Sequence, residues 1–334
     1  MNRKYKILNK LIKENSKILK IIKKEIKKAK KIAVIGHVNP DGDCIGSQLA
    51  LAEALKLLHK EVTCINEGEF ETEYAKMFKD FFKTNIEYKD YDLYIIVDTS
   101  SKSRIGNLEK DVDFSKSIVI DHHLKNANFG KINWVAEDFI SCSEMIFLLF
   151  YYLKIDLSKN NINQFLLNGI LSDNGYFQHI RINKFFSLFA SYYLIESGAN
   201  PKKSYDIMFC NNTLETEKLF SLVLSRISYY KTENLVWTYL LYNDKKENAE
   251  ISSGMIFREM MSLKNVKISV YFKTYEDGKV SISFRSTDDI NVAKIAEFFG
   301  GGGHKVASGA SLYGDFEEIK DKVLNKAYEE LSIK

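Results

Sequence analysis

An apolar run leads directly into a polar loop at residues 31–43, which read KIAVIGHVNPDGD. The apolar half, Lys31–Gly36, predicts a strand that is buried on both faces, as is typical of parallel sheets covered by helices. A helical pattern follows at Ile45–Leu58, and a second apolar strand follows at Glu61–Asn66. This order of strand, helix and strand predicts an α/β fold with a doubly wound, mostly parallel sheet.

Further strands and helices are predicted on both sides of this stretch. Two more apolar strands are predicted at Leu93–Val97 and Ser117–Ile120. Upstream, residues 4–30 place isoleucine and leucine at helical spacing between lysines, which predicts one amphipathic helix docked on the domain. Ser141 and Glu144 form a capping-box signature that opens a further helix. More helical patterns follow at Asn160–Leu171, Phe185–Glu196 and Glu215–Tyr230.

A second, smaller α/β domain is predicted in the C-terminal third of the chain. Strand patterns return at Leu235–Tyr242, Val266–Thr274 and Val280–Arg285, and helical patterns return at Ile251–Met261, Ile290–Phe299 and Phe316–Leu331. We therefore expect a first domain at residues 1–200, which includes the amphipathic helix, and a second domain at residues 233–334. A helical connection is expected at residues 201–232.

Composition excludes several classes of protein. The 334 residues are 45% hydrophobic and 28% charged, which fits a soluble globular chain with a sizeable core. No apolar stretch approaches the roughly 18–20 residues of a membrane span, and the lysine-rich start lacks a secretory signal pattern. A net charge of +4 is too close to balance to indicate a general nucleic-acid binder. Four cysteines without a C-x-x-C pair predict reduced, mostly core thiols, so we expect a cytoplasmic protein without a membrane partner.

Carboxylate and imidazole side chains follow three of the predicted strands at the point where each strand ends. In a parallel sheet the carboxyl ends of the strands meet at one edge, so we expect these side chains to gather there. An aspartate at the end of the helix that runs to Leu171 is expected to join them. The candidates are His37, Asp41, Asp43, Asp98, Asp121, His122, His123 and Asp173.

Each of these features has a plainer interpretation when it is taken alone. Asp and Gly after Pro40 often form a turn, an aspartate after a strand is often a helix cap, and adjacent histidines often lie in a surface turn. Their coincidence at successive strand ends favours a metal site, because several aspartates in one pocket repel unless cations neutralise them. The mixed ligand set suits two divalent ions, with Mn²⁺ expected ahead of Mg²⁺, Co²⁺ or Zn²⁺.

The second domain offers a candidate anion site. The glycines of Gly300–Gly303 follow a helix and can bring backbone N–H groups close to an anion, and His304 would add a directed donor. A flexible helix exit is the alternative for this segment. Arg285 closes a predicted strand, where its planar guanidinium suits either phosphate recognition or a surface ion pair.

At this point the chain resembles a known family. The HVNPDGD stretch, Asp98 in VDTS, the DHH triplet at Asp121–His123 and the SDNG at Ser172–Gly175 resemble the four motifs of the DHH phosphoesterases. In the second half, Ser283–Ser286 and Phe299–His304 resemble the two signatures of the DHH-associated domain. The combination is similar to the nanoRNase/pAp phosphatase group.

This resemblance covers about Lys31–Leu331 and includes two departures. The fourth motif reads SDNG where the family usually has Thr-Asp-Thr-Gly, and Lys305–Gly309 is looser than the usual Ala-Ala-Gly. Neither departure removes a ligand. The resemblance implies a catalytic DHH domain and a DHH-associated substrate-binding domain, with the active-site cleft between them.

The resemblance also implies a role for each candidate residue. One metal would be held by His37, Asp41 and Asp98, and the other by Asp43, Asp98, His122 and Asp173, so that Asp98 bridges. His123 would lie beside the scissile phosphate, with Asp121 orienting the histidines, while Arg104 would contact phosphate or secure its loop. Asp98, His123 and Asp43 are the implied catalytic residues. The implied substrate contacts are Arg104, Arg285, Ser286, Gly301, Gly302, Gly303 and His304.

The expected activity is a metal-dependent phosphohydrolase with short RNA oligonucleotides and nucleotide bisphosphates as its partners. It would shorten very short RNA to mononucleotides and dephosphorylate 3′,5′-bisphosphate nucleotides such as pAp by two-metal activation of water. Hydrolysis of linear dinucleotides such as pApA is the first alternative. A manganese pyrophosphatase, a RecJ-type exonuclease for long substrates and a non-catalytic nucleotide-binding module rank lower. A homodimer stays open at this stage.

Overall fold

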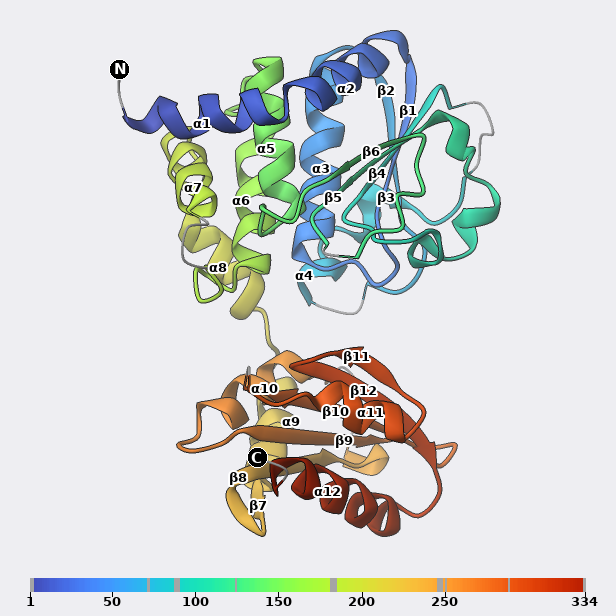
Figure 1. Ribbon diagram of the computed structural model, residues 1–334, viewed down its shortest axis with the longest axis vertical. Helices are drawn as coiled ribbons and strands as arrows, with labels where there is room; N and C mark the ends of the chain where they lie inside the picture. The colour runs from blue at the N-terminus through green and yellow to red at the C-terminus, as the bar shows by residue number, and fades with distance from the viewer. Residues whose placement is uncertain are drawn as a thin grey trace. The chain divides into compact units, whose positions relative to one another are not determined.

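The computed structural model describes residues 3–70, 73–86, 91–123, 125–180, 185–244, 249, 251–287 and 289–332. The chain forms two compact units, Met1–Asn211 and Asn212–Lys334, and each is built on one six-stranded sheet (Figure 1). The division lies inside the segment at residues 201–232 that is expected to be a connection. The α/β fold class is as predicted.

The first unit holds a fully parallel sheet with the strand order β3-β2-β1-β4-β5-β6. Its central strand β1 lies between β2 and β4, so the order of the sheet reverses there. The carboxyl ends of β1 and β4 therefore flank the switch point at which open α/β sheets bind ligands. The strands are β1 (Lys31–Ile35), β2 (Glu61–Ile65), β3 (Phe82–Lys83), β4 (Leu93–Val97), β5 (Ser117–Asp121) and β6 (Ile132–Val135).

The two faces of this sheet pack against different layers. Ile32 and Val34 of β1 belong to a core shared with α3, α5 and α6, which lie side by side in Figure 1. Ala33 and Ile35 face the opposite way, toward Ile105 of a 3-10 segment. The elements around the sheet are α3 (Gly42–Leu57), α4 (Glu73–Lys76), η1 (Lys79–Phe81), η2 (Lys102–Lys110), η3 (Phe114–Lys116), α5 (Cys142–Leu153), α6 (Ile162–Asp173), α7 (Phe186–Glu196) and α8 (Pro201–Phe209).

The lysine-rich start forms two helices, so the single helix predicted for residues 4–30 is wrong. The helices α1 (Arg3–Glu14) and α2 (Ser16–Lys28) meet at Asn15. The Asn15 amide donates to the Leu11 carbonyl at 2.9 Å, and its oxygen accepts from the indole N–H of Trp134 at 2.9 Å. A residue far along the chain therefore fixes this break, which local spacing does not reveal.

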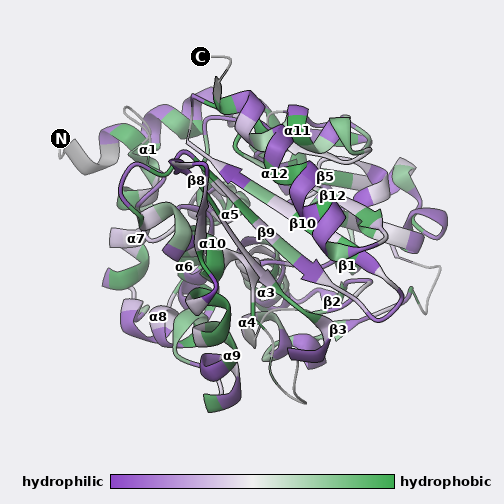
Figure 2. Cartoon of the chain, turned by 90° about the horizontal axis from the view of Figure 1, so that it is seen from below, coloured by the Kyte–Doolittle hydropathy of each residue, from purple (hydrophilic) through white to green (hydrophobic). Residues whose placement is uncertain are grey.

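The second unit holds a mixed sheet with the strand order β11-β12-β10-β9-β8-β7, in which only β8 and β9 pair in parallel. Phe272 and Ile282 pack under α11 and α12, while Val236 and Tyr271 pack under α9 and α10. The bands of both colours along α12 in Figure 2 are those of a helix that covers a sheet with one face. The elements are α9 (Leu214–Ser225), β7 (Ser228–Tyr230), β8 (Thr232–Leu240), η4 (Tyr242–Asp244), α10 (Ser253–Ser262), β9 (Ile268–Thr274), β10 (Lys279–Ser286), α11 (Val292–Phe298), β11 (Gly302–His304), β12 (Ala307–Tyr313) and α12 (Phe316–Ser332).

Several elements differ from the prediction. The helix predicted for Glu215–Tyr230 ends at Ser225, and its last residues form β7, which pairs with β8. The strands β3, β6, β11 and β12 were not predicted. The strand β12 is hard to predict because its sequence, ASGASLY, consists mostly of small residues. These give little of the alternation between apolar and polar residues by which strands are identified.

Candidate metal centre

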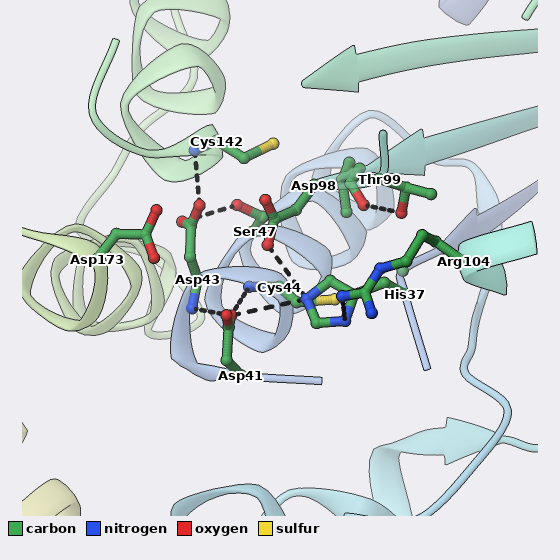
Figure 3. A network of polar contacts seen from close by, with 12 residues as sticks. His37, Asp41, Asp43, Cys44, Ser47, Asp98, Thr99, Arg104, Cys142 and Asp173 are labelled. Carbon is green, nitrogen blue, oxygen red and sulfur yellow. Dashed lines mark hydrogen bonds and ion pairs between the residues drawn. The ribbon is translucent and has the colours of Figure 1, made fainter. Parts of the chain in front are cut away.

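Three neighbouring strands end at one edge of the parallel sheet and bring the predicted side chains together (Figure 3). His37 lies two residues beyond β1, Asp98 follows β4 directly, and Asp121 is the last residue of β5. The α3 helix begins in the loop after β1, so its first turn carries Asp43 to the same edge.

Asp98 lies at the centre of this group. One carboxylate oxygen, Oδ2, is 3.5 Å from His37 Nε2, and the other, Oδ1, is 3.4 Å from His122 Nε2. The side chain is only 3% exposed, yet Oδ1 has no hydrogen-bond partner. Burial by itself would raise the pKa of Asp98, but the two imidazoles outweigh burial and lower it.

The backbone of Asp98 has a left-handed conformation, with φ at +53°. Few residues adopt this region readily, and Asp and Asn are among those that do. The Asp98 amide donates to the Ile120 carbonyl of β5 at 3.0 Å. The strained conformation is therefore held by the neighbouring strand, and such strain is common at functional sites.

His37 turns Nε2 toward the centre and Nδ1 toward the backbone. Its Nδ1 lies 2.8 Å from the Val38 carbonyl, to which a protonated Nδ1 donates. Nε2 is then the nitrogen that faces Asp98, and it is available as a ligand. The exposed guanidinium of Arg104 lies 3.3 Å from Nδ1, and the Arg104 carbonyl accepts from the Val38 amide at 2.8 Å.

Asp41 caps the helix that begins beside it. Its Oδ1 accepts from the backbone amides of Asp43 and Cys44 at 3.0 Å each. The same oxygen lies 3.9 Å from His37 Nε2, and the side chain is 54% exposed. The N-cap bonds thus orient a carboxylate toward His37 from the open side of the centre.

Asp43 is fully buried and joins two helices. Its carboxylate accepts from the amides of Cys142 at 2.6 Å and Ser143 at 2.9 Å, at the first turn of α5. Burial, reinforced by the nearby Asp98 carboxylate, raises the pKa of Asp43 to about 7. The helix N-terminus therefore stabilises a negative charge that its surroundings otherwise disfavour.

Asp173 ends α6 and reaches the group from the opposite side. Its Oδ2 lies 3.2 Å from His122 Nε2, and burial, followed by the charges of Asp43 and Asp98, raises its pKa. The chain then turns sharply, because Tyr176 and Phe177 both have positive φ, at 52° and 72°. Such strain in two aromatic residues, three and four positions after a candidate ligand, is unusual.

His123 contacts Asp121 through Nδ1, whereas His37 and His122 face Asp98 through Nε2. Its Nδ1 lies 2.7 Å from Asp121 Oδ1, and Asp121 Oδ2 accepts from the Asn126 amide at 2.7 Å. The bond to Asp121 raises the pKa of His123. Since Asp121 is fully buried and His123 is 42% exposed, the buried carboxylate orients an imidazole whose Nε2 is left for other partners.

Three groups of ligand-type atoms form within the described residues, each spanning no more than 4.8 Å. Their members are His37, Cys44 and Asp98; Asp98, His122 and His123; and Asp43, His122 and Asp173. Asp41 lies outside these groups, although the sequence predicts it as a ligand. Cys44 is inside one, and the sequence had assigned it to the core. Its position one residue after Asp43 was the available signal.

The donor set fits a divalent metal ion. Asp98 Oδ1 is a buried charged oxygen without a hydrogen bond, which is costly unless a cation binds it. Burial, followed by the charges of nearby carboxylates, raises the pKa of Asp43 and of Asp173, as expected where buried acidic groups gather without a cation. Buried carboxylates and imidazoles in one group are the ligands of borderline divalent ions.

The substrate contacts predicted in the second unit lie on β10, on β11 and, for Gly301, directly before β11. The Arg285 guanidinium lies 4.8 Å from the centre of the Phe257 ring and donates to the Phe284 carbonyl at 2.9 Å. Burial lowers the pKa of Arg285, although a guanidinium stays protonated at neutral pH. The Ser286 hydroxyl donates to the Ile290 carbonyl at 2.9 Å.

The glycine segment is part strand and part helix end. Gly302–His304 form β11 at the edge of the sheet, so the backbone groups on its outer side have no strand partner in the described part of the chain. The Gly301 amide donates to the Ala296 carbonyl of α11 at 2.8 Å, and a Cβ on Gly301 would lie 2.1 Å from the Gly309 carbonyl. Gly301 therefore has a structural role that the sequence did not indicate.

Comparison with known protein families assigns both units. Residues 31–171 match the family described as "DHH family, N-terminal domain", and residues 233–332 match the "DHHA1 domain". The chain contains a DHH domain followed by a DHHA1 domain. Residues 31–171 of this DHH protein span β1 to α6, so they include every predicted ligand except Asp173.

Relatives of this DHH protein are similar over most of their length. A "bifunctional oligoribonuclease and PAP phosphatase NrnA" of Thermus thermophilus is 27% identical over 316 residues, which cover 90% of each chain. The protein of the same name from Bacillus subtilis is 26% identical over 282 residues, covering 83% of this chain and 88% of that one. An uncharacterised protein of Mycoplasma genitalium is 28% identical over 305 residues, covering 89% and 91%.

Solved structures share the fold. An "exopolyphosphatase-related protein" of Bacteroides fragilis superimposes with a TM-score of 0.81 at 25% identity and covers 93% of this chain and 96% of its own. The exonuclease RecJ of Thermus thermophilus in complex with Mn²⁺ has a TM-score of 0.52 at 14% identity, covering 94% of this chain and 54% of its own. RecJ supports the fold alone at this identity.

These comparisons confirm two predictions. The predicted resemblance to the DHH phosphoesterases is confirmed by both family matches, and the predicted class of enzyme, a hydrolytic phosphoesterase, is confirmed with it. Among the described residues, the helices are all too short or too polar to cross a bilayer.

Proposed function

We propose that this DHH protein is a metal-dependent phosphohydrolase of short nucleotide substrates. It shortens very short RNA oligonucleotides to mononucleotides and removes a phosphate from 3′,5′-bisphosphate nucleotides such as pAp. The names of the relatives from Thermus thermophilus and Bacillus subtilis support this choice of substrates. The free cysteines of the structure support a cytoplasmic setting.

The observation that carries the proposal is the position of Asp98, a buried carboxylate with one imidazole facing each of its two oxygens and with no hydrogen bond on Oδ1. Asp98 can therefore be shared by two divalent ions, for which Mn²⁺ suits the mixed donor set. When bound, such ions lower the pKa of water and stabilise charge on phosphate oxygens. The proposed ligands are His37, Asp41 and Asp98 for one ion, and Asp43, Asp98, His122 and Asp173 for the other.

His123 has the geometry of a general acid in this proposal. Its Nδ1–H is held by Asp121, and its raised pKa favours the protonated ring. The Nε2–H is then available to donate to the leaving oxygen or to a phosphate oxygen. Asp121 acts through His123 and is a positioning residue.

Substrate binding is proposed for residues of both units. Arg104 is the proposed phosphate contact in the first unit, and its guanidinium lies 3.3 Å from His37 Nδ1. In the second unit, Arg285, Ser286, Gly302, Gly303 and His304 are the proposed contacts, with Gly301 shaping the segment. We accordingly assign catalysis to residues 1–200 and substrate binding to residues 233–334, with residues 201–232 as the connection.

A hydrolysis assay with Mn²⁺ tests this proposal. The substrates are pAp, a diribonucleotide, a longer RNA, pApA and inorganic pyrophosphate. Fast release from pAp and the diribonucleotide, with little from the longer RNA and pyrophosphate, is the expected result. A preference for pApA would favour the dinucleotide phosphodiesterase instead, and preferred cleavage of pyrophosphate would overturn the proposal. Tight binding of pAp without any hydrolysis would indicate a nucleotide-binding module.

A further inference from the structure

The metal centre contains a thiol that has no role in the proposed function. His37, Cys44 and Asp98 each place a ligand atom within 4.8 Å of the other two, and all three residues are buried. Cys44 stands on the first turn of α3, directly after Asp43. Figure 3 shows Cys44 beside His37, on the side of the centre nearer to Arg104 than to Asp173.

The sulfur is held in a fixed position by buried polar side chains. The thiol donates to Gln48 Oε1 at 3.5 Å, and the Asn66 amide approaches Sγ at 4.0 Å. Gln48 in turn donates to the carbonyls of Val34 and Ile65 at 3.1 and 3.2 Å. Such outer contacts keep a metal ligand oriented before any ion arrives.

Gly36 provides the space that the sulfur occupies. A Cβ at this position would lie 2.3 Å from Cys44 Sγ and 2.4 Å from Gln48 Oε1. Any other residue directly after β1 would force the thiol or the Gln48 side chain to shift. The end of the central strand is therefore shaped around this side chain as well as around the histidine.

A second observation points to a ligand for the same group. Only 3% of Asp98 is exposed, and its Oδ1 has no hydrogen-bond partner. The group thus offers an imidazole nitrogen, a sulfur and a buried carboxylate together, and the other oxygen of that carboxylate, Oδ1 on the side of His122, is the one without a hydrogen bond. That donor set is softer than one built from oxygen and nitrogen alone.

We propose that Cys44 makes this centre thiophilic, so that His37, Cys44 and Asp98 together bind a soft divalent ion such as Zn²⁺ or Cd²⁺. This inference rests on the proposed metal-dependent function and adds a rule for which metals the site accepts. As the sulfur–metal bond forms, the thiol proton leaves to solvent and the bond to Gln48 is lost. Hard ions such as Mn²⁺ and Mg²⁺ gain little from sulfur, so they leave the thiol protonated.

Inhibition by soft ions follows from this geometry. An ion held by the Cys44 sulfur occupies ligands that the proposed hydrolysis needs, namely His37 and Asp98. Zn²⁺ is therefore expected to inhibit the Mn²⁺-supported reaction, and more strongly in the wild type than in Cys44→Ser. The serine keeps the size of the side chain and removes only the soft donor.

The test uses the full chain stripped of metal and titrated with Cd²⁺. Cadmium bound to a thiolate absorbs in the near ultraviolet, which reports the sulfur–metal bond without any catalysis. Wild type is expected to show this band with one sulfur per bound ion. Cys44→Ser is expected to lose it, with the ratio of Cd²⁺ to Mn²⁺ affinity falling by about tenfold or more. Cys64→Ser is the matched control, because Cys64 is buried and lies outside the described ligand groups.

The outcomes separate this inference from the proposed function. Absence of the band in wild type, or its persistence in Cys44→Ser, would overturn the inference, and the first of these needs no variant to fold. A chain that hydrolyses pAp but shows no band refutes only the thiophilic site. A chain that shows the band but hydrolyses none of the five substrates with Mn²⁺ refutes the proposed function and keeps the site.

Discussion

Asp98 combines a left-handed backbone with a carboxylate buried between two imidazoles. Asn can adopt the same backbone conformation and fill the same space. Asn is tolerated at positive φ and has nearly the same shape, but its neutral amide is a poor metal ligand. We expect Asp98→Asn to lower Mn²⁺-dependent kcat/KM by at least about 100-fold while Tm stays within a few degrees of wild type. Retention of substantial turnover at saturating Mn²⁺ would contradict the shared-ligand role.

The proposed role of His123 as a general acid can be tested by changing the leaving group. If the Nε2–H of His123 protonates the leaving oxygen, its removal matters most for leaving groups that need a proton. His123→Ala is expected to slow hydrolysis of pAp by about 100-fold or more, but to slow a p-nitrophenyl phosphoester much less, since p-nitrophenolate leaves unprotonated. Steady-state rates on the two substrates provide the comparison. Equal losses on both would place His123 in binding instead.

At the scale of elements, the close approach of α3 to α6 positions both Asp43 and Asp173. A Cβ on Gly46 of α3 would lie 2.5 Å from the Phe165 carbonyl of α6, which is backbone and cannot rotate away. We expect Gly46→Ala to push the helices apart, lower stability by about 1–3 kcal/mol and weaken Mn²⁺ binding. Denaturant unfolding and Mn²⁺ titration measure the two effects.

A glycine with room around it gives the matched control. Gly254 lies in α10, and the nearest atom to its Cβ position is Ser252 Oγ at 3.8 Å. Because alanine is the better helix former, Gly254→Ala should leave stability unchanged or raise it by about 0.5–1 kcal/mol. A Gly46→Ala protein as stable as this control would show that α3 and α6 do not need their close contact.

The ion pair of Arg226 and Asp244 joins the end of α9 to the segment after β8. Arg226 donates to both Asp244 oxygens, and the Leu241 amide donates to one of them at 2.7 Å. The bond to Arg226 lowers the pKa of Asp244. A carboxyl whose pKa is lowered by folding stabilises the protein above its unfolded pKa, about 3.9, and loses that contribution as pH falls through its folded value.

Asp244→Asn should therefore destabilise the second unit at neutral pH by about 1–3 kcal/mol. The difference from wild type is expected to shrink as pH falls below about 4, where Asp244 itself becomes protonated. Urea unfolding between neutral and acidic pH follows the difference directly. A gap between the two proteins that is the same at every pH would mean that the charge of Asp244 is not what stabilises the loop.

How much of this could be predicted from sequence depends on whether the signal is local. The strands before His37 and Asp98 are short apolar runs, so the convergence of these ligands follows from the rule that parallel strands end at one edge. The break at Asn15 could not be foreseen, because its partner Trp134 is 119 residues away. The position of the Cys44 sulfur beside His37 could not be predicted either. It depends on the hydrogen bond to Gln48 and on the space left because Gly36 has no side chain.

At the scale of the whole molecule, each unit has hydrophobic cores of its own. The core clusters around the parallel sheet contain residues of the first unit alone, and those around the mixed sheet contain residues of the second alone. All the proposed metal ligands lie in the first unit. Metal binding should therefore stabilise one part of the chain directly, because a ligand stabilises the folded region that holds it.

Calorimetry with and without Mn²⁺ tests this division of the molecule. We expect two unfolding transitions, and Mn²⁺ should increase the free energy of unfolding for one of them by about 2.7 kcal/mol per bound ion when its concentration is 100 times its Kd. The Asp98→Asn protein should show the same two transitions with a much smaller shift, and Asp244→Asn should lower only the transition that Mn²⁺ leaves in place. A single transition that Mn²⁺ and Asp244→Asn both move would show that the two units unfold together, and that their separate cores do not confer separate stability.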